Sequence, residues 1–188
     1  MNNPKVKEKI IEACIREFNE FGWKMTMNHL ASVLGMSKKT IYTYFDSKEA
    51  MFEYILLECK NEVNTKHFEI YHDEHLDSLT KLKKILMIHP KYEVKIDTTK
   101  IYEFEQHMPR VYLDLLDSFQ NNWVYPIKLI EECKSKGLIK NIETSLIIDI
   151  LKNSYQGFYR GDALKKDNIS YKDAIDKLAE IVLEGIIK

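Results

Sequence analysis

Hydrophobic residues recur every three or four positions along most of the chain, which is the spacing of helices that bury one face. The first such stretch predicts a helix over residues 4–21, closed by Gly22, because glycine readily adopts the left-handed conformation that ends a helix. Two short helices are predicted next, one capped by Thr26 and one that is capped by Ser37 and ends at Phe45. The chain therefore opens with three helices.

The same spacing continues and predicts helices to the end of the chain. A fourth helix is expected after Asp46 or Ser47, whereas residues 66–78 are polar and are predicted to form a loop or a frayed helix end. Pro126 is expected to kink or split its helix, since an interior proline removes a backbone hydrogen bond. The later predicted helices cover residues 79–89, a segment capped by Thr98 or Thr99 that ends before Pro109, and residues 111–136, 145–159 and 170–187.

Composition agrees with an all-α fold of about nine helices. There are six glycines and four prolines in 188 residues, too few for many short strands, and 45% of the residues are hydrophobic, enough for a buried core. The N-terminus has no signal-peptide pattern, and no stretch of about 18 residues is continuously apolar. We therefore expect a cytoplasmic protein without membrane contact.

The sequence offers little for catalysis or for a cofactor. Its three cysteines, Cys14, Cys59 and Cys133, are far apart, and their spacing indicates neither a disulfide framework nor a zinc site. Motifs of common hydrolases, nucleotide-binding enzymes and zinc proteases are missing. We expect no enzymatic activity, no cofactor and no bound metal.

Positive charge gathers near the N-terminus, although the formal net charge of the chain is −1. Between Gly22 and Lys48 there are four lysines, and Asp46 is the only acidic residue. Since electrostatic attraction acts over about 10 Å at moderate salt, this local excess matters more for phosphate binding than the total charge.

Residues 26–48 read TMNHLASVLGMSKKTIYTYFDSK, which is the layout of a helix-turn-helix unit. The second helix of such a unit enters the major groove of DNA, which is about 12 Å wide. Base edges are the predicted targets of Lys38, Lys39, Thr40 and Thr43, and phosphates those of Thr26, Tyr42, Tyr44 and Lys48; Ser37, the cap, completes the predicted DNA-binding set. Outside this motif the same lysines would be read as a solvated face.

This segment closely resembles the TetR (tetracycline-repressor-like) family of regulators. Lys39 departs from the pattern, because the family usually has a small residue or proline there; a long cation could reach guanine or a phosphate. The matching residues are Phe18, Phe21, Gly22, Thr26, Leu30, Ala31, Gly35, Met36, Ser37, Thr40, Ile41, Tyr42, Tyr44, Phe45, Ser47, Lys48 and Glu49.

The resemblance implies a DNA-binding domain over residues 1–48 and a ligand-binding and dimerisation domain over residues 49–188. Proteins of this family are homodimers whose last two long helices form a four-helix bundle with those of the partner, and two heads related by two-fold symmetry read a near-palindromic operator. The residues predicted for this interface are Ile147, Leu151, Tyr155, Ile175, Leu178, Val182 and Ile186.

The resemblance also implies a pocket for a small-molecule inducer that releases a repressor from double-stranded DNA. Aromatic side chains with polar groups can line an apolar pocket and still orient a ligand, although each of them can equally serve packing alone. The predicted pocket residues are Tyr102, Phe104, Phe119, Trp123, Tyr155 and Phe158.

Two other functions are compatible with parts of the sequence. A helix-turn-helix adaptor would act through protein partners, but the Lys/Thr/Tyr face of the predicted third helix has little apolar surface to anchor one. A metal-responsive regulator would use His67, His72 and His75, although their spacing fits no compact zinc pattern.

Overall fold

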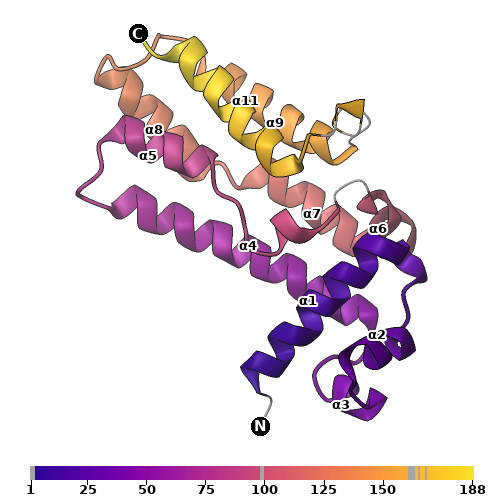
Figure 1. Cartoon of the computed structure of the whole chain (residues 1–188). Coiled ribbons are helices and arrows are strands. Elements are labelled where there is room, and N and C mark those ends of the chain that lie inside the picture. Colours follow the sequence, from indigo (N-terminus) through magenta and orange to yellow (C-terminus); the bar gives the residue numbers. More distant parts are fainter. Residues whose placement is uncertain (1–2, 98–99, 161–163, 165, 168) are drawn as a thin grey trace.

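The computed structural model describes residues 3–97, 100–160, 164, 166–167 and 169–188, and within these ranges the chain is built from helices without a β-sheet (Figure 1). The all-α prediction is confirmed. A head is formed by α1 (Pro4–Phe21), the 3₁₀ turn η1 (Gly22–Lys24), α2 (Met27–Leu34) and α3 (Lys38–Tyr42). The body contains α4 (Lys48–His72), α5 (Ser78–Leu86), the turn η2 (Glu93–Lys95), α6 (Tyr102–His107), α7 (Pro109–Asn121), α8 (Val124–Ser135), α9 (Thr144–Arg160) and α11 (Tyr171–Ile186).

The helices of the head begin and end where local side chains satisfy their free backbone groups. Thr26 accepts a hydrogen bond from the backbone N–H of His29, and Ser37 accepts one from Thr40, so each caps the helix that follows it. Gly35 closes α2 in the left-handed conformation, with φ 60° and ψ 28°. Hydrogen bonds between residues close in the sequence therefore determine where most helices of the head begin and end.

Several predicted boundaries are wrong. Residues 66–72, predicted as a loop or a frayed helix end, continue α4, because His67 is turned inward and packs against the body. α5 ends at Leu86 instead of residue 89. α3 ends at Tyr42 instead of Phe45. The break between α7 and α8 falls at residues 122–123, ahead of Pro126, which lies in the first turn of α8, where its missing N–H costs nothing. The predicted caps Thr98 and Thr99 lie outside the described residues.

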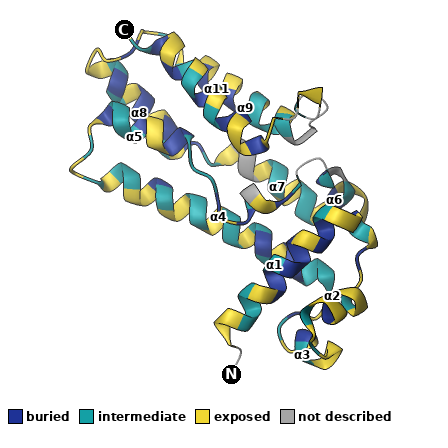
Figure 2. Cartoon of the chain, in the orientation of Figure 1, coloured by how far each residue is buried: buried dark blue, intermediate teal, exposed yellow. Residues whose placement is uncertain are grey.

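Two hydrophobic clusters hold the structure together. The first joins the head to the body: the Phe18 ring of α1 stacks on Phe104 of α6, with 5.3 Å between centroids, and meets Phe52 of α4 edge-on at 4.9 Å. The second lies inside the body between α5, α8, α9 and α11. α4 runs from the head along the body (Figure 1), and its outer face is the exposed one (Figure 2). A displacement of α4 would consequently reach both regions.

None of the helices in the described ranges combines the length and the apolar character that crossing a bilayer requires.

Candidate DNA-binding surface and ligand cavity

α3 presents its polar side chains outward and one apolar side chain inward. Lys38, Lys39 and Tyr42 are exposed, whereas Ile41 is fully buried against the first cluster. Most of the α3 ribbon is correspondingly exposed (Figure 2). In the part of the chain that the structure describes, neither lysine takes part in an ion pair. The two ammonium groups are thus available to a ligand of opposite charge.

The hydroxyl groups of this surface already have local contacts. The hydroxyls of Ser37 and Thr40 lie 2.8 Å apart, and Thr43 donates to the backbone carbonyl of Thr40 at 2.6 Å. The Tyr44 hydroxyl accepts a hydrogen bond from the backbone N–H of Asn3 at 3.2 Å, which ties the beginning of α1 to the end of the α3 region. These contacts fix the orientation of the side chains without covering the surface.

Lys48 lies between the head and α4 with its ammonium turned inward. Its Nζ donates to the carbonyl of Trp23 at 2.6 Å and lies 4.3 Å from the centre of the Trp23 ring. Burial lowers the pKa of this ammonium. In this arrangement Lys48 braces the turn before α2; the phosphate contact assigned to it from the sequence stays a prediction.

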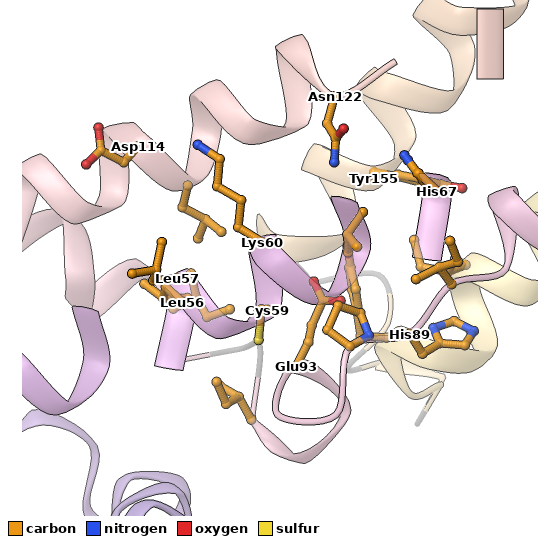
Figure 3. Close-up of a pocket in the computed structure, with 18 of the residues that line it drawn as sticks. Leu56, Leu57, Cys59, Lys60, His67, His89, Glu93, Asp114, Asn122 and Tyr155 are labelled. Carbon is orange, nitrogen blue, oxygen red and sulfur yellow. The ribbon is translucent and has the colours of Figure 1, made fainter. Parts of the chain in front are cut away.

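A cavity of about 670 Å³ lies in the body, within the range of small-molecule sites. Of the predicted pocket residues, Trp123 and Tyr155 line it. Figure 3 shows Tyr155 in the cavity wall. Phe104 does not, because its ring fills the core under α1, and Phe158 packs against that same cluster. The side chains of Tyr102 and Phe119 lie outside what the structure describes.

The two ends of this cavity differ in polarity. At its outer end are Glu53, Lys60, Arg110 and Asp114, all exposed. At its inner end are His67, Asn122, Trp123, Pro126 and Tyr155, all buried or half-buried. Here the Tyr155 hydroxyl donates to the carbonyl of Leu86 at 3.0 Å, and burial lowers the pKa of His67 to about 4.

His89 is a further polar residue of the cavity wall. Its Nε2 lies 2.6 Å from a carboxylate oxygen of Asp176 on α11. Cys59 also lines the cavity, and burial raises the pKa of its thiol to about 12, so it stays protonated and behaves as a small apolar residue.

The residues predicted for a dimer interface mostly face the interior of the protomer. Ile147, Leu151, Ile175 and Ile186 are buried in the chain's own clusters, Tyr155 lines the cavity, and Leu178 and Val182 are half-buried. Helical spacing identifies an apolar stripe without saying what covers it, and in this protomer the chain's own helices cover the four buried residues. The outward apolar residues of α9 and α11 are Leu146 (52% exposed), Ile150 (46%) and Ile181 (67%).

The three histidines of the alternative metal site differ in their exposure to solvent. His67 is buried, whereas His72 and His75 are exposed, and the Nδ1 of His72 lies 2.8 Å from the backbone carbonyl of Phe68. Among the described residues no three His, Cys, Asp or Glu side chains come close enough together to hold a metal ion.

Comparison with known proteins identifies the head. Residues 10–55 match the family model described as bacterial regulatory proteins of the tetR family. The helix-turn-helix head therefore matches the TetR family. The chain is 25% identical over 179 residues to an uncharacterized HTH-type transcriptional regulator, YvaF, of Bacillus subtilis (strain 168), with 95% of this chain and 94% of YvaF covered.

Solved structures show the same TetR-family fold over the whole chain. The TetR-family regulator PfmR from Thermus thermophilus superposes with a TM-score of 0.68 at 16% identity, covering 93% of this chain and 97% of PfmR. The ketosteroid transcriptional regulator KstR2 of Mycobacterium tuberculosis gives a TM-score of 0.69 at 16% identity, covering 100% and 97%. The whole chain thus shares the fold of these regulators, and the family match covers its helix-turn-helix head.

Sequence reasoning missed the part that several residues play in the folded protein. His67 and Asn122 line the inner end of the cavity, and Glu103 of α6 contacts the turn at Trp23. His67 carried a signal, because a histidine on the apolar side of a long helix is uncommon, but residues 66–78 were predicted to form a loop or a frayed helix end. No local pattern distinguishes Glu103 from the exposed acidic residues around it.

Proposed function

We propose that this protein is a repressor that leaves a near-palindromic operator when a small molecule occupies the body cavity. One observation carries the proposal: a helix-turn-helix with an exposed Lys/Thr face is packed onto a body that holds a cavity of about 670 Å³. Residues 1–48 act as the DNA-binding domain and residues 49–188 as the ligand-binding and dimerisation domain. Such a regulator works in the cytoplasm, where the chromosome lies.

The DNA contacts follow from the exposure of each side chain. Lys38, Lys39, Thr40 and Thr43 are the candidates for base edges, where lysine reads guanine and the threonine methyl contacts thymine. Thr26 lies at the beginning of α2, where its hydroxyl and the backbone N–H groups of the helix N-terminus bind a phosphate. Tyr42, Tyr44 and Lys48 are the candidates for contacts with the phosphate backbone of DNA. Ser37 caps α3 and so orients the side chains that reach the DNA.

The dimer uses the outward faces of α9 and α11. These two helices pack on each other within one protomer, and Leu146, Ile150 and Ile181 project from them. Exposed apolar side chains on adjacent helices favour burial against a second copy, and a two-fold arrangement would form a four-helix bundle. Two-fold symmetry of the protein requires a near-palindromic operator.

A ligand would act on DNA binding through the segment that connects the cavity to the head. Glu93, Ile96 and Ile101 line the cavity. The same segment holds the end of α1: the Asn19 side chain donates to the Lys95 carbonyl at 2.6 Å and accepts from the backbone N–H of Asp97 at 2.7 Å. A ligand that favours a shifted position of this segment by about 1–3 kcal/mol changes the affinity for the operator about 10- to 100-fold.

The test is a titration of the protein against genomic DNA fragments, including the region beside its own gene, followed by fluorescence anisotropy at two salt concentrations. We expect one fragment to bind at least about 10³-fold more tightly than bulk DNA, with a steep salt dependence. Lys39→Ala and Thr40→Ala should change the preferred sequence, whereas Lys5→Ala, outside the helix-turn-helix, should not. Equal and weak binding of all fragments would contradict the operator proposal and favour an adaptor that binds proteins.

A further inference from the structure

The cavity is elongated along α4. Glu53, Lys60 and His67 line it at intervals of seven residues, which places them on one face of this helix. At 1.5 Å per residue, the distance along the helix from Glu53 to His67 is about 20 Å. A volume of about 670 Å³ spread over such a length fits a long or flat molecule better than a round one.

The inner end of this cavity contains a polar group that lacks a partner. His67 is only 6% exposed, and its Nδ1 is buried without a hydrogen bond in the described part of the protein. A buried unpaired nitrogen destabilises a fold and is rare in native proteins. Rotating the His67 imidazole by half a turn about its Cβ–Cγ bond leaves the ring in the same space. It only exchanges the positions of the ring's nitrogen and carbon atoms. A hydrogen-bonding group of a ligand would compensate this nitrogen.

A second polar side chain lies at the same end. Asn122 stands at the break between α7 and α8, and in Figure 3 its amide points toward the end of the cavity that holds His67 and Tyr155. The Trp123 and Tyr155 rings lie 5.6 Å apart and form an apolar wall beside it. An amide supplies both a donor and an acceptor, as does a neutral imidazole.

The five side chains grouped at the inner end, His67, Asn122, Trp123, Pro126 and Tyr155, offer no counterion to a charged ligand group. They are uncharged at neutral pH, because burial holds the pKa of His67 at about 4. Two ionisable residues line the cavity beside them: His89 is paired with Asp176, and the carboxylate of Glu93 would repel an anion. An ion moved from water into such surroundings is strongly disfavoured unless it is paired. The charged residues of the outer end are exposed and of both signs, so they give a charged ligand little net attraction.

We propose that the cavity selects an elongated, mostly apolar molecule with an uncharged hydroxyl or carbonyl group, which His67 and Asn122 bind at the inner end. This inference rests on the proposed role of the cavity as the effector site. A ligand that placed a methyl group there would leave the His67 nitrogen unpaired, and one that placed a carboxylate or ammonium there would lose hydration without gaining an oppositely charged group from the five side chains of the inner end.

Three probes with the same alkyl chain separate these possibilities: decan-1-ol, decanoate and decylammonium, titrated into the full-length protein by isothermal calorimetry at pH 7.5. We expect decan-1-ol to bind at least about tenfold more tightly than either ion. Decanoate binding as tightly as the alcohol, and weakened by Lys60→Gln, would overturn the inference and place a carboxylate at the outer end.

Two matched variants on α4 assign the effect to its residue. His67→Leu should weaken decan-1-ol about tenfold and leave decanoate unchanged, whereas His72→Leu, the same substitution at an exposed position, should change neither. Circular dichroism and retained DNA binding show that each variant folds. Equal alcohol affinity in His67→Leu and wild type would overturn the role of His67 while the cavity remained a ligand site. If DNA binds normally but none of the three probes binds, the inference falls, whereas the effector role of the cavity falls only if no compound that occupies it releases the DNA.

Discussion

The carboxylate of Glu103 accepts a hydrogen bond from the backbone N–H of Trp23 at 2.6 Å, which fastens α6 to the turn between α1 and α2. The Trp23 ring stacks in parallel on His107 at 5.1 Å, and Lys48 holds the Trp23 carbonyl from α4. Body residues thus hold this turn from two sides. The orientation of α2 and α3 therefore depends on how α4 and α6 are placed.

Gly22 allows this close approach, and its replacement should be costly. Its backbone has φ 59° and ψ −144°, a combination found almost only in glycine, and a Cβ there would lie 2.5 Å from a carboxylate oxygen of Glu103. We expect Gly22→Ala to lower the free energy of unfolding by about 2–3 kcal/mol in urea denaturation.

Gly35→Ala provides the control for this prediction. Gly35 has φ 60°, but nothing lies within 4 Å of the added Cβ, so only the left-handed conformation is penalised, by about 1 kcal/mol. Equal losses for Gly22→Ala and Gly35→Ala would show that the contact with Glu103 is unimportant.

Lys48→Ala should destabilise the protein and weaken DNA binding to all sequences alike. It leaves the Trp23 carbonyl without its charged donor, which corresponds to about 1–2 kcal/mol for a half-buried group. Stability is measured by urea denaturation, with Lys38→Ala as an exposed control that should change it by less than about 0.5 kcal/mol.

The salt dependence of DNA binding by Lys48→Ala then separates two roles. If Lys48 contacts a phosphate, the slope of log affinity against log salt should fall by about one. If Lys48 only positions the turn, the affinity should fall and the slope should stay constant. Unchanged affinity and slope would exclude both roles.

His67 should make the fold sensitive to acid above the range of most carboxylates. Its pKa is lowered by burial to about 4, so between that value and about 6.5 the unfolded chain binds more protons than the folded one. The fold is therefore destabilised as the pH falls through this window, by about 2 kcal/mol at pH 5, and is unaffected above it.

The measurement compares the free energy of unfolding at pH 7.5 and pH 5.0 in wild type, His67→Leu and His72→Leu. The drop should be smaller in His67→Leu and unchanged in His72→Leu. Other titrating groups, such as Asp176, contribute equally to all three proteins, so their effect cancels. The same drop in all three would contradict the buried neutral imidazole.

Ile181→Glu and Ile150→Glu should convert a dimer into folded monomers, because each places a charge at the centre of the proposed interface. Sedimentation equilibrium gives the mass, and DNA affinity should fall with it. Leu113→Glu, at an equally exposed apolar position on α7 (63%), should stay dimeric. Dimers that persist in both α9 and α11 variants would place the interface elsewhere.

The sequence alone determined the elements whose causes are local. α1 was predicted with its observed bounds, and the caps Thr26 and Ser37 with Gly35 defined the helix-turn-helix. These features depend on hydrogen bonds between residues two to four positions apart, which the order of residue types specifies. The family resemblance rested on the same segment and is confirmed.

Tertiary structure decided everything that depends on what covers a face. The apolar stripes of α9 and α11 were visible as spacing, but their packing onto α5 and α8 turned Ile147 and Leu151 inward and left Ile150 outward. His67 was predicted to lie in a loop or a frayed helix end, and the body packed against it extended α4 and placed it in the cavity wall. Helical periodicity fixes which residues share a face, whereas the neighbour of that face is set by contacts between residues far apart in the chain.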